Sequence, residues 1–184
     1  MPSNPPSIAL PTDDEIRPDV LDRLKTMPPL NIIRALARTP ECFGPWLDFV
    51  AGIYAMDFDP RLREIALCRY GNIANSPYEL EQHTALARGR GVTDAELTAI
   101  ASEHPVTTLD DDGNLICRVV DEFEGTATLG DDTLAVLLGR FEESTVMTLL
   151  VTLGHYSCVV RVVNAARVPL EGTSPLAGRG SPTG

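Results

Sequence analysis

The chain has 184 residues and carries 15 Lys and Arg against 26 Asp and Glu, which gives a formal net charge of −11 at pH 7. This length suits one domain that buries a core without disulfide or metal staples. The acidic balance argues against nucleic acid as a partner, because phosphate binding needs clustered Lys and Arg.

Membrane and export signals are missing from the sequence pattern. The longest apolar stretch, residues 146–163, is interrupted by His155 and Arg161 and falls short of the roughly 20 residues that span a bilayer. The opening Met-Pro-Ser-Asn-Pro-Pro has neither the charged nor the apolar region of a signal peptide. We therefore expect a cytoplasmic protein with no membrane partner. Cytosolic disulfides are rare, so the four cysteines, which form no C-x-x-C pair, are expected to be free and mostly buried.

The two ends of the chain are poor in core-forming residues. Residues 1–13 contain four prolines, and residues 172–184 are rich in Gly, Ser and Pro. Such composition is typical of flexible tails, although tails of this kind also wrap neighbouring subunits. We expect a single all-α domain over residues 14–171.

Between these tails the apolar residues follow a helical period. Short helices are predicted over residues 18–26 and 30–37. Thr39-Pro40 and Asp59-Pro60 each have the pattern of a capping residue followed by proline at the first helical position. The helix that begins at Pro60 is expected to reach about residue 74.

The second half of the chain continues the helical pattern. Ser76 and Glu79 have capping-box spacing, as do Thr93 and Glu96. Further helices are predicted over residues 93–102, 115–123, 131–138 and 143–166. No segment shows sustained strict alternation, so no strand is predicted. The expectation is an all-α fold of about eight or nine helices joined by short loops.

One histidine and two glutamates form the main candidate site. His83 follows Glu79 by four residues, so the two side chains share one helix face. A carboxylate beside an imidazole orients it and raises its pKa, which suits a general acid or base. A short turn at Asn75 lays the helix of Glu64 antiparallel to that of His83, within about one turn in level. The spacing of Glu79 and His83 also fits a pair on the protein surface, and Glu64 could instead pair with a nearby arginine. The sequence leaves both alternatives open.

The other histidines and the tyrosines are weaker candidates. His104 precedes a loop at a predicted helix end and is expected to be solvated. His155 lies in a largely apolar helix, where it is either a core residue or a ligand-binding group. Tyr78 and Tyr156 are either hydrogen-bond donors in a pocket or packed aromatic residues.

Metal and nucleotide cofactors are not expected. Di-iron helical bundles use Glu-x-x-His, whereas Glu79 and His83 are separated by three residues, and no H-E-x-x-H or paired cysteine is present. The chain also lacks the G-x-G-x-x-G, Walker and G-x-S-x-G motifs.

Three segments in order resemble the carboxymuconolactone decarboxylase family, which includes the AhpD-type alkylhydroperoxidases. They are F-D-P-R-L-R-E-I-A-L at residues 58–67, S-P-Y-E-L-E-Q-H at 76–83 and G-V-T-D-A-E-L at 91–97. The stretch from L-G-H-Y at 153–156 to V-P-L at 168–170 is similar to the closing helix of many members. The resemblance covers roughly residues 30–170. It implies an AhpD-like all-α fold with antiparallel helix pairs, a trimeric or hexameric homo-oligomer, and no cofactor.

The resemblance also shows a departure that bears on chemistry. The peroxidase branch of the family has a Glu, eleven residues, and then C-x-x-C-x-x-x-H. Glu64 and His83 match that pattern, but Ser76 and Glu79 stand where the two cysteines would be. Thiol peroxidases need a reactive thiolate and a resolving partner, so this activity is not expected. The chain is similar instead to the non-redox, decarboxylase-like branch, in which the face bearing Glu79 and His83 lines a small pocket.

These features predict a cofactor-independent decarboxylase or lyase that acts on a small organic acid or lactone. His83 is the expected proton donor, Glu79 its orienting partner and Glu64 a second acid–base group or an anchor. The expected substrate contacts are Tyr78, Ser76, His155 and Tyr156.

An anionic substrate would need a positive partner in so acidic a site. Arg61, Arg69 and Arg161 are the candidates. An isomerase or cyclase that tailors an uncharged natural product would avoid this need. A non-catalytic helical binding or scaffold subunit is the third possibility.

Overall fold

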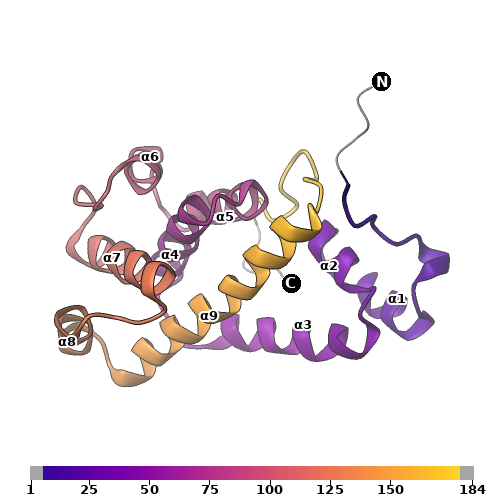
Figure 1. Cartoon of the computed structure of the whole chain (residues 1–184), viewed down its shortest axis with the longest axis horizontal. Helices are drawn as coiled ribbons and strands as arrows, with labels where there is room; N and C mark the ends of the chain where they lie inside the picture. Colours follow the sequence, from indigo (N-terminus) through magenta and orange to yellow (C-terminus); the bar gives the residue numbers. More distant parts are fainter. Residues whose placement is uncertain (1–5, 179–184) are drawn as a thin grey trace.

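The computed structural model describes residues 6–178, and this part of the chain is helical with no strand (Figure 1). Within residues 6–178, a short 3-10 helix at Asp13–Glu15 precedes nine α-helices. Their bounds are α1 Pro18–Leu24, α2 Asn31–Leu36, α3 Pro40–Ala55, α4 Pro60–Ile73, α5 Pro77–Gly89, α6 Asp94–Ser102, α7 Asp111–Thr126, α8 Asp131–Arg140 and α9 Glu143–Ala166. The all-α class and the expected number of helices are confirmed.

The helix starts follow local sequence signals. Proline occupies the first turn of α1, α3, α4 and α5, where a missing N–H costs no helical hydrogen bond. The Asp59 carboxylate caps α4 by accepting the N–H groups of Arg61 at 2.8 Å and Leu62 at 2.9 Å. Thr93 and Glu96 form the predicted capping box at the start of α6. These starts were predictable because both partners of each cap lie within one turn of the chain.

Two local predictions are wrong. Ser76 makes no side-chain cap on α5, and Glu79 is turned toward His83, while the Ser76 N–H that a capping box would use donates to the Gly71 carbonyl. Helix α7 begins four residues before the predicted range of 115–123, with Asp110 accepting the N–H of Gly113 at 2.7 Å. The acidic first turn of α7 has few apolar residues, so the hydrophobic period did not reveal it.

Helix α4 lies at the centre of the fold. Ten consecutive residues are buried, from Leu62 to Gly71, because α5, α6, α7 and α9 all contact this helix. Charged side chains on α4 are therefore buried with the apolar ones. A buried charge is costly unless it is paired, so each of these groups must find a partner on a neighbouring helix.

A tight turn returns the chain from α4 to α5. Asn75 adopts the left-handed conformation, with φ at 49°, and Asn tolerates this region better than most residues. The Ser76 N–H donates to the carbonyl of Gly71 at 2.9 Å and closes the turn. A Cβ on Gly71 would lie 3.1 Å from the Leu80 side chain, so this glycine permits the close approach of the two helices. The predicted turn therefore brings α4 and α5 together.

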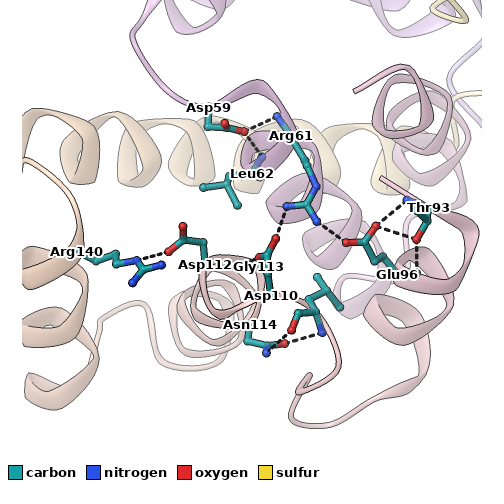
Figure 2. A network of polar contacts seen from close by, with 11 residues as sticks. Asp59, Arg61, Leu62, Thr93, Glu96, Asp110, Asp112, Gly113, Asn114 and Arg140 are labelled. Atoms are coloured by element: carbon teal, nitrogen blue, oxygen red, sulfur yellow. Dashed lines mark hydrogen bonds and ion pairs between the residues drawn. The ribbon is translucent and has the colours of Figure 1, made fainter. Parts of the chain in front are cut away.

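A polar network ties α4 to α6 and α7. Figure 2 shows the Arg61 guanidinium between two carboxylates, Glu96 on α6 and Asp110 at the start of α7. Arg140 on α8 pairs with Asp112 in the first turn of α7 at 2.5 Å. These contacts hold the α6–α8 part of the molecule against the central helix.

Two apolar cores are joined by α9. The first core lies among α4, the end of α5, α6, α7, α8 and α9. The second core lies among α1, α2, α3, part of α5 and the end of α9. Figure 1 shows α9 running diagonally from α8 to the neighbourhood of α2. The surfaces of α4, α5, α3 and α9 that meet between the two cores surround the site described below.

Helix α9 is long and apolar enough, by length and composition alone, to cross a bilayer. The apolar stretch within α9 was expected to be too short to span a bilayer because His155 and Arg161 interrupt it. More than half of the most apolar 18-residue window is buried inside the protein. Such packing is that of a core helix and is compatible with a soluble protein.

The described parts of both predicted tails contact the helical domain. Near the N-terminus, the Ile8 N–H donates to the Ala166 carbonyl at 3.0 Å, and Arg34 donates to the Pro11 carbonyl at 2.7 Å. After α9, Arg167 takes a left-handed conformation with φ at 54°, and the chain turns back across α2 and α5. Residues 1–5 and 179–184 of these tails lie outside the described residues.

Candidate functional site

The helix pair α4–α5 brings Glu64 and His83 into contact. The Nδ1 atom of His83 lies 2.8 Å from Oε2 of Glu64, and both side chains are almost fully buried. The predicted juxtaposition of these two residues is therefore present. The contact leaves Nε2, the other ring nitrogen of His83, directed away from Glu64.

Glu79 occupies this second side of His83. Its Oε2 atom is 3.4 Å from His83 Nε2, one helical turn earlier on α5. Burial acts to lower the pKa of His83, but the charges and hydrogen bonds of Glu64 and Glu79 outweigh it and raise the pKa to about 9. His83 is accordingly an imidazolium at neutral pH, held between two carboxylates.

Aromatic side chains surround this charged group. The ring of Tyr156 on α9 packs edge-on to His83, with 4.9 Å between centroids. The hydroxyls of Tyr156 and Tyr54 lie 2.9 Å apart, and the guanidinium of Arg63 sits 4.5 Å from the Tyr54 ring centre. Burial raises the pKa of both tyrosines, so both remain protonated. Arg63 Nε also lies 3.8 Å from Glu64 Oε1 and adds positive charge beside this carboxylate.

A small, mainly apolar cavity opens beside His83 and Glu79. About 40 Å³ is free inside it, which is room for a few water molecules. The lining residues are Leu30, Ile32, Ile33, Trp46, Val50, Tyr78, Glu79, Gln82, His83, His155, Tyr156, Val159 and Leu176. The cavity therefore places one acid–base pair against an apolar surface.

His155 belongs to the aromatic wall of this cavity. Its ring lies 5.6 Å from Trp46, 5.3 Å from Phe49 and 5.3 Å from Tyr156. Burial lowers the pKa of His155 to about 4, so the ring is neutral at physiological pH. His155 thus differs in charge from His83, although both line the same cavity.

The predicted substrate contacts are only partly brought together. Tyr78, His155 and Tyr156 line the cavity with Glu79 and His83. Ser76 is fully buried without lining it, and its Oγ has no hydrogen-bond partner. The prediction that Ser76 contacts the substrate therefore does not fit the structure, because the start of α5 packs against α4.

Three further residues that line the cavity, Trp46, Gln82 and Leu176, were not predicted from the sequence. Gln82 follows Tyr78 by four residues and shares its helix face, a signal that was present in the sequence. Trp46 lies in α3 among apolar residues, a pattern that equally fits an ordinary core residue. Leu176 belongs to a segment predicted to be a flexible tail.

The three candidate arginines are engaged elsewhere. Arg61 bridges α6 and α7 (Figure 2). Arg69 is fully buried, where it pairs with Asp121 and donates to the Ile100 carbonyl. Arg161 is an exposed partner of Glu124. None of these arginines lines the cavity, so they do not supply the expected positive contact for a substrate.

The cysteines lie away from a redox arrangement. Cys68 and Cys117 are buried, whereas Cys42 and Cys158 are exposed, so only half of them match the expectation of burial. Burial raises the pKa of Cys68 and that of Cys117, which keeps both as thiols. Within residues 6–178, no group of three or more His, Cys, Asp and Glu is arranged to hold a metal ion.

The chain was compared with known proteins. No protein-family model matches it, and a search of curated proteins finds no matching sequence.

Proposed function

We propose that the protein is a cofactor-independent lyase of the decarboxylase type that acts on a small organic acid or lactone. One observation carries the proposal: a buried Glu64–His83–Glu79 relay ends at an apolar cavity. Few structural roles require an imidazolium between two buried carboxylates, and perturbed groups of this kind concentrate at functional sites. The resemblance to the carboxymuconolactone decarboxylase family agrees with this chemistry and with an AhpD-like fold.

His83, Glu64 and Glu79 have different roles in the proposed decarboxylation. When the bond to the carboxyl carbon breaks, carbon dioxide leaves and its bonding electrons remain on the substrate as an enolate-like carbanion. His83 donates its Nε2 proton to that carbon and becomes neutral, and solvent restores the proton. Glu64 fixes the ring through Nδ1, and Glu79 holds the proton-bearing side of the ring toward the cavity. General acid–base steps of this kind contribute roughly 10²–10⁴-fold to a rate.

The same residues argue against a thiol peroxidase. Ser76 and Glu79 occupy the positions of the two redox cysteines in the family pattern. Cys68, which lies on α4, is held as a thiol by burial. Thiol-dependent peroxide consumption is therefore expected to be absent.

The apolar wall supports a second candidate function. Trp46, the neutral ring of His155 and Tyr156 present aromatic surface to the cavity. This surface fits an isomerase or cyclase that tailors an uncharged aromatic compound, with His83 moving a proton without loss of carbon dioxide. Release of carbon dioxide separates the two functions, and tight binding without conversion would instead favour a non-catalytic binding subunit.

A cytoplasmic homo-oligomer, trimeric or hexameric, is part of the proposal. Large apolar side chains are exposed on α3 and α9, namely Phe49, Met147 and Val162. Exposed apolar surface of this kind marks subunit interfaces in other proteins. The mass of the purified protein in solution, from light scattering, tests this assembly.

Turnover in D₂O tests the catalytic proposal. A panel of carboxylated lactones, β-keto acids and phenolic acids is screened for release of carbon dioxide, and deuterium at the vacated carbon is measured by NMR. For any substrate found, His83→Asn should lower kcat at least 100-fold while the protein stays folded. His104→Asn, a change outside the cavity, should leave kcat within twofold. An unchanged rate in His83→Asn would refute the acid–base assignment.

A further inference from the structure

The segment after α9 places a carboxylate in a cradle beside the cavity. Oε1 of Glu171 accepts the hydroxyl of Tyr78 at 2.6 Å and the backbone N–H of Asn31 at 2.6 Å. Oε2 of Glu171 accepts the side-chain amide of Gln82 at 2.7 Å. Three neutral donors from two helices thus converge on one carboxylate.

Both side-chain donors are fixed in orientation by other contacts. The Tyr78 oxygen accepts the N–H of Ile32 at 3.0 Å, so its own hydrogen is free to point at Glu171. Oε1 of Gln82 accepts the hydroxyl of Ser174 at 2.6 Å, which directs Nε2 of the amide toward Glu171. Burial, followed by the hydrogen bond to Glu171, raises the pKa of Tyr78, so the phenol stays a donor. Donors fixed in this way suit a carboxylate, which only accepts hydrogen bonds. They disfavour a carboxamide, because its own N–H₂ group would point at other donors.

The cradle is adjacent to the acid–base pair on the same helix. Tyr78 and Gln82 are four residues apart on α5, and Glu79 and His83 form the next row along the same surface. All four side chains line the cavity. A small molecule whose carboxylate is held by Tyr78 and Gln82 would extend its adjoining carbons over Glu79 and His83.

The cavity as it stands is too small for such a molecule. About 40 Å³ is free, and Leu176 of the same C-terminal segment fills one side of it. Residues 171–178 contain no helix and are held to α5 through Glu171 and Ser174. Segments with few backbone contacts open more easily than packed helices.

We propose that the Tyr78–Gln82–Asn31 cradle is the carboxylate-binding subsite of the ligand, and that Glu171 occupies it in the free protein as an internal stand-in. Binding exchanges one carboxylate for another, so the charge beside Glu79 and His83 is unchanged and no arginine is required. The inference rests on the proposed function and narrows its substrates to compounds with a free carboxylate next to an unsaturated or aromatic group.

Fluorescence of the only tryptophan of the chain, Trp46, gives a direct assay because this residue lines the cavity. Benzoate is titrated into the full-length protein, with benzamide as the neutral analogue of the same shape. Glu171→Ala should vacate the cradle and lower the benzoate Kd about tenfold or more, as expected for hydrogen bonds to a charged group. The benzamide Kd should change by less than twofold.

Two further variants separate the cradle from simple loosening of the segment. Asn31→Ala removes the side-chain hydrogen bond from Asn31 to the Pro169 carbonyl but keeps the backbone N–H of residue 31 and leaves Glu171 in place, so it should gain less benzoate affinity than Glu171→Ala. Tyr78→Phe in the Glu171→Ala background should abolish the gain. If Glu171→Ala folds poorly, Glu171→Gln keeps the shape and should give the same preference for benzoate over benzamide.

Several results would overturn the proposal. They are an unchanged benzoate Kd in Glu171→Ala, an equal gain for benzamide, and a gain that survives Tyr78→Phe. The readout is equilibrium binding and needs no turnover. Failure of the cradle is thus distinguishable from failure of the proposed reaction, which His83→Asn tests.

Discussion

Replacement of Glu64 by Gln is the sharpest test of the electrostatics of the site. The substitution keeps the shape of the side chain but removes the charge that faces His83 Nδ1 at 2.8 Å. Burial opposes a charged His83, and Glu64 is the larger of the two contributions that overcome it. Without Glu64, the pKa of His83 should fall from about 9 to near or below its ordinary value of 6.5.

The magnitude follows from proton linkage. A histidine whose pKa is raised on folding stabilises the protein fully below pH 6.5, and this stability is lost as the pH rises through 9. A change from 6.5 to about 9 corresponds to roughly 3 kcal/mol. The free energy of unfolding of the wild type should therefore fall by roughly 3 kcal/mol between about pH 6 and pH 10, apart from other titrations. Glu64→Gln should lack most of this fall.

Two measurements check this prediction. Long-range ¹H–¹⁵N NMR spectra give the pKa of His83, and urea unfolding at a series of pH values gives the stability. Glu79→Gln is the matched variant, because its carboxylate lies farther from the ring, at 3.4 Å, and should lower the pKa less. The reasoning is refuted if wild-type His83 titrates near 6.5, or if Glu64→Gln leaves its midpoint in place.

Three further predictions concern stability. Because burial lowers the pKa of His155 to about 4, protonation of this group should lower the free energy of unfolding by about 2 kcal/mol from pH 7 to pH 5. His155→Phe should remove that acid sensitivity in urea unfolding. An unchanged dependence of stability on pH in this variant would contradict the prediction. Arg69→Met leaves the Asp121 carboxylate without its buried partner and should cost about 3–5 kcal/mol of stability. Adding Asp121→Leu to this variant should restore part of the loss. Additive losses in the double variant would count against pairing of Arg69 with Asp121. Thr93→Ala removes a capping box and should cost about 1 kcal/mol of stability. Ser76→Ala removes a hydroxyl with no hydrogen-bond partner and should cost less than about half of that. Equal losses of stability in thermal unfolding would show that Ser76 caps α5 after all.

Those parts of the site could be predicted in which the interacting residues lie close together along the chain. The turn at Asn75 and the helix starts at Pro60 and Pro77 were sufficient to place Glu64 opposite His83, because two helices joined by a tight turn have one register. The spacing of Glu79 and His83 placed both on one face of α5. The prediction that Ser76 and Glu79 form a capping box was wrong, since His83 offers Glu79 a partner that competes with the backbone.

The sequence by itself determined the all-α class, most helix starts and the Glu64–His83 pair, because periodicity, caps and tight turns act between residues close along the chain. Only the tertiary structure decided which groups are buried and what they face. Arg69 is fully buried although it is a charged residue, because helices from distant parts of the chain enclose α4. The contact of Glu171 with Tyr78, 93 residues away, likewise depends on how α9 crosses the fold, and no local pattern encodes it.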